Sequence, residues 1–97
     1  MSSGRTAGTI WKFPIEWGDT VVKMPKGAAI IHAAMQGTEP CIWAVVAPDA
    51  EPEDRVIVLY ETGHDMLPQG QHVHIGSFLV DEDKLVFHVF EIVSAWP

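Results

Sequence analysis

The sequence predicts an all-β fold: a small antiparallel sandwich or barrel of about seven short strands, meander-like and with little helix. Short runs rich in Val, Ile, Trp and Phe alternate along the chain with clusters of Gly, Pro and Asp. Such runs are typical of strands, and such clusters are typical of tight turns. With 97 residues, 47% hydrophobic and 20% charged, the chain has the composition of one globular domain. We expect a flexible extension at residues 1–8 and a single β domain at residues 9–97.

Seven segments have the apolar content expected of strands. In the first, Trp11, Phe13 and Ile15 share one face because strand side chains alternate between faces. Pro14 cannot donate a hydrogen bond to a neighbouring strand, so this strand is expected at a sheet edge or at a bulge. The strands are expected at residues 9–16, 20–24, 28–36, 41–47, 55–62, 72–80 and 84–94.

Helix is weakly supported. Residues 28–35 are rich in Ala, which favours helix, but a segment this short between Pro-Lys-Gly and Gln-Gly nucleates a helix poorly. We therefore favour a strand there. The loop at residues 63–70 is compatible with a single helical turn.

Two expected strands, residues 55–62 and 84–94, carry apolar side chains on both faces. A strand in an antiparallel sheet with one core normally has one polar face. The second apolar face therefore needs a cover, which is either a terminal segment such as the one containing Trp96 or another subunit. We expect a homo-oligomer.

The charge distribution argues against a protein that coats nucleic acid. The formal net charge is -7, and 11 of the 13 acidic residues lie in residues 27–97. Seven carboxylates fall in two turns, at residues 49–54 and 81–83. These turns are either ordinary solvated loops or a surface that blocks a basic groove on a partner. The apolar runs are too short to span a membrane, and the first eight residues lack the apolar core of a signal peptide.

Cys41 is the only cysteine, so no internal disulfide is expected. Its apolar surroundings in the sequence predict a small buried side chain rather than a nucleophile. A reducing compartment is compatible with this cysteine usage.

His72 and His74 have the only spacing in the chain that resembles a metal site. Residues two apart on a strand point to the same side, and His88 on the next strand would be a third ligand in a suitable register. The alternative is a solvated pair of histidines. We expect no metal and no cofactor, and His72 and His74 remain weak metal candidates.

The remaining candidate binding residues lie in loops and strands around the expected sheet. His64 and Asp65 follow Gly63, which gives a sharp exit from an expected strand, and loops on a rigid scaffold often carry function. An exposed Trp is typical of a binding hot spot, whereas the alternative is that Trp17 covers the core edge. No catalytic motif is present, so we expect no enzymatic activity. The candidate ligand- or partner-binding residues are Trp17, Lys23, Lys26, His64, Asp65 and His88.

Several motifs resemble a family of small proteins of unknown function encoded in phages and prophages. They are Ile-Trp-Lys-Phe-Pro-Ile at 10–15, Met-Pro-Lys-Gly-Ala at 24–28, Cys-Ile-Trp-Ala-Val-Val at 41–46, Thr-Gly-His at 62–64 and Leu-Val-Phe-His-Val-Phe-Glu at 85–91. The resemblance implies a small β domain that works in the cytoplasm of a bacterial host, and it implies no catalytic residues.

By analogy, we expect a non-enzymatic accessory protein that acts by stoichiometric binding, in counter-defence or host takeover. Its partner would be a host protein or a small signalling nucleotide. The nucleotide would bind at a subunit interface through Trp17, His64, Lys23 and Lys26, and the acidic body disfavours it unless the two lysines line the pocket. The alternatives are a structural accessory of the virion and a small metal-dependent hydrolase built on His64, His72 and His88.

Overall fold

The computed structural model describes residues 8–68, 70–82 and 84–93 and forms seven antiparallel strands in two sheets, so the predicted all-β sandwich is confirmed. Residues 1–7 of the expected N-terminal extension lie outside the described residues, and so does Trp96. None of the described segments forms a helix long and apolar enough to cross a bilayer. The strands are β1 (Thr9–Pro14), β2 (Asp19–Pro25), β3 (Ala29–Gln36), β4 (Glu39–Val46), β5 (Pro52–Glu61), β6 (Gln71–Val80) and β7 (Leu85–Val93).

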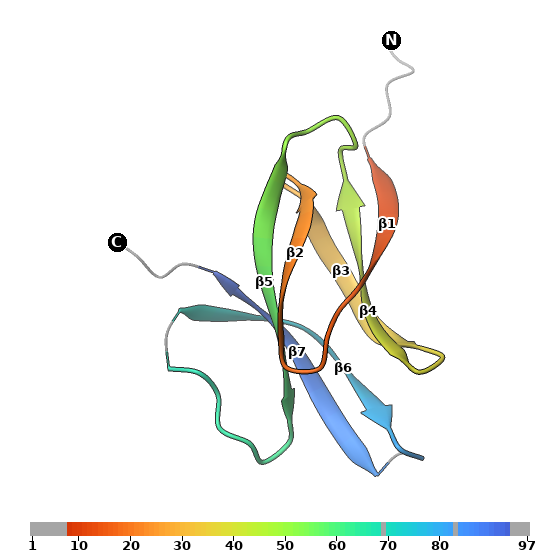
Figure 1. Ribbon diagram of the computed structural model, residues 1–97, viewed down its shortest axis with the longest axis vertical. Helices are drawn as coiled ribbons and strands as arrows, with labels where there is room; N and C mark the ends of the chain where they lie inside the picture. Colours follow the sequence, from red (N-terminus) through yellow and green to blue (C-terminus); the bar gives the residue numbers. More distant parts are fainter. Residues whose placement is uncertain (1–7, 69, 83, 94–97) are drawn as a thin grey trace.

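The two sheets are open and packed against each other, and they do not close into a barrel (Figure 1). Sheet A has the order β1-β4-β3, and sheet B has the order β2-β5-β7-β6. Among the described strands, only β3–β4 and β6–β7 are hairpins of consecutive, hydrogen-bonded strands. The chain changes sheet after β1, β2 and β4, so the order departs from the expected meander. A short loop can join two strands of one sheet as a hairpin, or it can join two strands of different sheets. The length of the loop alone does not distinguish these two connections.

The expected strands all form, with small shifts at their ends. Residues 29–36 are a strand and not a helix, because they pair with β4 and place Ala33 in the core. The first strand ends at Pro14 on a sheet edge, as predicted. Ile15 then leaves the ladder, and its amide donates to the Pro40 carbonyl at 2.9 Å.

The core lies between the inner faces of the two sheets. Ile42 and Ala44 of β4 face Ile57 and Leu59 of β5 and Val89 of β7 in one buried cluster. This inward set shows the two-residue period of strands. The outward residues of β5 and β7 are therefore those with even numbers.

The edges of the two sheets approach closely where β3 meets β6. Both strands carry a bulge there, between Ile30 and His32 and between His74 and Gly76. A Cβ atom on Gly76 would lie 3.6 Å from the Cβ of Ala33, so two small residues let the edges meet. Bulges bend a strand, and here they turn the edges of β3 and β6 toward each other.

Cys41 is completely buried in β4, between Pro14 of β1 and Ala34 of β3. Burial raises the pKa of the Cys41 thiol, and the nearby Glu39 carboxylate raises it further. The thiol is therefore protonated and shielded at neutral pH.

We expect Ellman's reagent at pH 8 to leave Cys41 unmodified in the native protein and to titrate one thiol in 6 M guanidinium chloride. The pKa of the Cys41 thiol is higher in the folded than in the unfolded chain. The contribution of this thiol to the free energy of unfolding is therefore fully present below about pH 8.5, and it is lost at higher pH as the unfolded thiol ionises. Native labelling as fast as that of the denatured chain would contradict the buried position. The Cys41→Ser variant, which should take up no reagent in either state, is the control.

Candidate functional site

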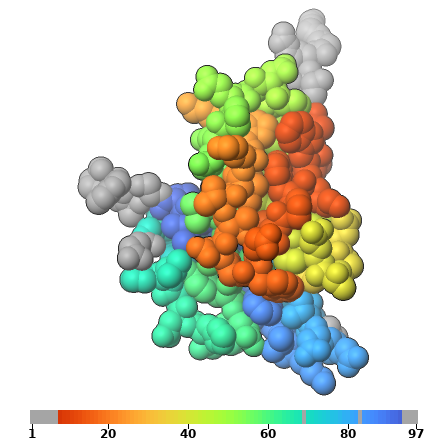
Figure 2. Space-filling view, viewed as in Figure 1, coloured from red at the N-terminus to blue at the C-terminus, as the bar shows by residue number. Residues whose placement is uncertain are grey.

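A groove opens at one end of the sandwich, where the turn between β3 and β4 faces the hairpin between β6 and β7. The cavity has a volume of about 610 Å³, and we call it the end groove. Figure 2 shows the yellow β3–β4 turn and the blue β6–β7 hairpin side by side at this end. The walls of the end groove combine residues of both sheets and of their connections. They are Trp17, Met35, Gly37, Thr38, Leu79, Val80, Asp81, Glu82, Leu85 and Phe87.

Trp17 forms one wall of the end groove and remains 49% exposed. Its ring centroid lies 5.0 Å from that of Phe87 and 6.5 Å from that of Phe78, so aromatic neighbours hold it from behind. The backbone fixes the turn on both sides. The Gly18 carbonyl accepts from the Leu59 amide at 2.8 Å, and the Glu16 amide donates to the Thr20 hydroxyl at 2.8 Å. An exposed indole is therefore held in a defined position.

Asp81 and Glu82 form the acidic rim of the end groove. Both residues have a φ of 56°, in the left-handed region. Residues other than Gly, Asn and Asp rarely adopt this conformation, which costs about 1–2 kcal/mol per residue. Glu82 in particular stands where glycine would be relaxed. The acidic turn at residues 81–83 thus borders an apolar cavity; Asp83 lies outside the described residues.

A row of polar side chains crosses the outer face of sheet B. The His88 ring contacts the Ser77 hydroxyl through Nδ1 at 2.8 Å and the Thr62 hydroxyl through Nε2 at 2.7 Å. Nε2 of His74 lies 3.2 Å from the same Ser77 hydroxyl. The register explains the row, because His88 lies directly opposite Ser77 in the β6–β7 hairpin.

The chemistry of this row is hydrogen bonding between strands. A nucleophilic serine needs a histidine that a third, usually acidic, group orients. At His88 that position is held by the hydroxyl of Thr62. His72 binds the Tyr60 hydroxyl through Nε2 at 2.8 Å, whereas His74 turns to Ser77. Among the described residues no three His, Cys, Asp or Glu side chains are close enough to hold a metal ion.

A loop covers part of the same outer face. The Leu67 amide donates to the Tyr60 hydroxyl at 2.9 Å, and the Tyr60 ring packs against Phe90 and His72. Val58 and Tyr60 are buried although they point outward. The segment between β5 and β6 therefore supplies a cover that the sequence did not suggest. Val21 and Leu79 remain exposed.

A model of one protein family matches residues 6–95, and its description is a domain of unknown function, DUF7352. The chain belongs to this family. Both sheets, the end groove and the polar row all lie inside the matched range, so they are parts of the DUF7352 domain. Comparison with curated proteins and with solved structures gave no match. Membership of an uncharacterised family over most of the chain is thus confirmed, and the phage context stays a prediction.

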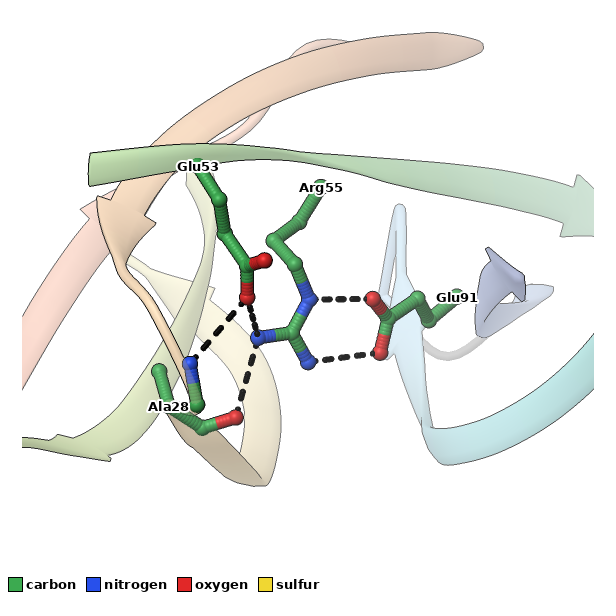
Figure 3. A network of polar contacts seen from close by, with 5 residues as sticks. Ala28, Glu53, Arg55 and Glu91 are labelled. Carbon is green, nitrogen blue, oxygen red and sulfur yellow. Dashed lines mark hydrogen bonds and ion pairs between the residues drawn. The ribbon is translucent and has the colours of Figure 1, made fainter. Parts of the chain in front are cut away.

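The opposite end of this DUF7352 domain contains a network of polar contacts around Arg55 (Figure 3). Its guanidinium donates to both carboxylate oxygens of Glu91, at 2.5 and 2.9 Å, and to the Ala28 carbonyl at 3.0 Å. Glu53 lies 3.4 Å from the guanidinium and also accepts from the Gly27 amide at 3.1 Å. Hydrogen bonding to Glu91 raises the pKa of Arg55. The network joins β5, β7 and the turn before β3, which is a structural role.

The structure separates the predicted binding residues into two groups. Lys23 pairs with Asp54 at 2.7 Å, near one end of β5. Trp17 packs on Phe87, which lies opposite Glu61 at the other end of β5. At the rise of a β-strand these two ends are about 23 Å apart. The expected nucleotide pocket would need both groups together, and one chain does not bring them together.

Of the other predicted residues, His64 and His88 lie at or near the polar row, whereas Lys26 lies near Lys23. His64 is exposed and lies 3.5 Å from Glu61, while Asp65 is exposed in the same loop. His88 is in the row itself. Lys26 follows β2, on the side of Lys23, and its amide donates to the Glu51 carbonyl at 2.7 Å.

Sequence reasoning missed two sets of residues. The walls Met35, Leu85 and Phe87 of the end groove have no local signal, because their meeting depends on how the two sheets pack. Glu91 had a signal, since a carboxylate on the inward face of an apolar strand needs a buried partner. Arg55 is that partner.

Proposed function

We propose that this protein is a non-enzymatic binding domain that acts stoichiometrically by occupying a partner protein. The observation that carries the proposal is the end groove, in which a half-exposed Trp17 is held against an apolar wall. Tryptophan in a pre-formed apolar depression is the kind of residue that dominates binding energy at protein interfaces. The proposal requires no chemical step.

The partner we favour is a protein of a bacterial host, in line with the resemblance to phage and prophage proteins. A signalling nucleotide is the weaker choice. Its phosphates would face the carboxylates of Asp81 and Glu82, and Lys23 and Lys26 lie toward the other end of the sandwich. A homo-oligomer stays part of the proposal, because Val21 on the outer face of sheet B is exposed.

Affinity capture from bacterial lysate tests this function. The tagged protein and its Trp11→Ala variant should retain one bacterial protein at a fixed molar ratio, and Trp17→Ala should lose it. Trp11 is the matched control because it is also a partly exposed tryptophan, 39% exposed, but does not line the end groove. Circular dichroism establishes that both variants are folded.

A lysate in which no protein is enriched over the tag alone would contradict the proposed function. Retention of the same protein by Trp17→Ala would contradict the role of the end groove. Sedimentation equilibrium of the purified, untagged protein should give at least twice the 10.7 kDa of one chain, and a mass of 10.7 kDa would contradict the homo-oligomer.

A further inference from the structure

We propose that the end groove receives a lysine or arginine side chain, flanked by apolar residues, of the partner protein. This inference rests on the proposed function and names the chemistry of the partner segment. The groove combines an apolar interior with a negatively charged rim. A ligand that matches both has an aliphatic part and a positive end.

The interior of the groove suits the aliphatic part. Met35, Leu85 and Phe87 supply apolar wall, and Trp17 presents a half-exposed indole. Lysine and arginine bury their hydrocarbon stems against such surfaces and keep the charged group in water. An indole face also attracts a cation within about 6 Å of its centre, more strongly than other aromatic rings do.

The rim suits the positive end. Asp81 and Glu82 are both exposed beside the cavity. Between residues that the structure describes, no ion pair involves either carboxylate, and both remain available to a ligand. Lys84 belongs to the same hairpin and reduces the local charge, but the two carboxylates outnumber it. The predominantly acidic body of the chain adds a longer-range attraction to a basic partner.

The backbone under the rim makes a clean test possible. Asp81 and Glu82 both have a φ of 56°, which asparagine tolerates and glycine adopts without strain. The double variant Asp81→Asn/Glu82→Gly removes both charges and relieves the strain together. We expect its melting temperature to rise by about 5 °C. Loss of binding in this variant therefore cannot be attributed to unfolding.

The probe is the peptide Ac-Gly-Leu-Lys-Leu-Gly-NH2, titrated into 15N-labelled protein and followed by NMR. We expect saturable shifts of the Trp17 indole N–H and of the Leu85 amide. The same peptide with Nε-acetyl-lysine keeps the aliphatic stem and lacks the charge, and it should bind at least fivefold more weakly. Raising NaCl from 50 to 500 mM should weaken the binding of the lysine peptide and leave the binding of the acetylated peptide unchanged.

The variants then assign the binding to the rim. Asp81→Asn/Glu82→Gly should bind the lysine peptide at least tenfold more weakly than the unaltered protein. The control Asp49→Asn/Glu51→Gln makes the same change in net charge in the other acidic turn, and it should bind within twofold. Equal affinity for the two peptides, equal affinity of the rim variant, or shifts confined to other residues would each overturn the inference.

Failure of this inference can be told apart from failure of the proposed function. If the rim variant retains the captured bacterial protein as well as the unaltered protein does, the inference is wrong and the binding function stands. If the lysate yields no partner while the lysine peptide binds the groove as described, the binding chemistry stands and the proposed function is wrong.

Discussion

Replacing Arg55 with methionine is expected to lower the free energy of unfolding by about 3–5 kcal/mol. The change removes both hydrogen bonds to Glu91, which is only 9% exposed, and the bond to the Ala28 carbonyl. A buried carboxylate without its partner lowers the free energy of unfolding, because little water can reach it to solvate its charge. Urea denaturation followed by circular dichroism measures the loss.

Two further variants separate the buried pair from charge in general. The double variant Arg55→Met/Glu91→Leu should be more stable than Arg55→Met alone, because no unpaired charge is left inside. Lys23→Met breaks the exposed pair with Asp54 and should cost less than about 1 kcal/mol. If Arg55→Met costs no more than Lys23→Met, the network of Figure 3 does not stabilise the fold as described.

The variant Ile42→Ala is expected to lose about 3 kcal/mol of stability, within the range of 2–5 kcal/mol typical of such changes. Ile42 is 0% exposed in the central strand of sheet A, between Phe13 of β1 and Ala33 of β3. Removal of three carbon atoms leaves a cavity between two sheets whose backbones are fixed by hydrogen bonds. The melting temperature should fall by more than 10 °C.

Ile10→Ala is the matched control for this prediction. Ile10 lies in edge strand β1 of the same sheet and is 59% exposed. The same chemical change there should cost less than about 1 kcal/mol. A similar loss at both positions would contradict a core centred between the inner faces of sheets A and B.

The strands were predictable because their signals are local. The alternation of apolar and polar side chains in residues 9–15 favours a strand in those residues, and a turn residue such as Gly37 bends the chain within a few residues of its own position. Strand order was not predictable in this way. The pairing of β1 with β4 and of β2 with β5 depends on which apolar faces meet across the core, and short connections allow either a hairpin or a change of sheet.

The candidate site shows the same division. Trp17 was notable in the sequence as a tryptophan in a turn, and residues 81–83 were notable as a run of carboxylates. Nothing local indicated that they border one cavity. The sequence grouped Lys23 with Trp17 at a subunit interface, and within one chain the two lie toward opposite ends of β5. The type of a residue suggests which chemistry it can perform. Which residues lie close together can be known only from the strand register of both sheets.

The strand order also has a consequence for how this chain folds. β7 occupies an inner position of sheet B, between β5 and β6, although it is the last strand in sequence. During synthesis β5 can pair with β2, whereas β6 has no hydrogen-bonded partner in sheet B until β7 is made. Pairing of strands far apart in sequence slows folding. Newly made chains thus pass through a stage with unpaired strand edges on β5 and β6, and such edges make a folding intermediate prone to aggregation.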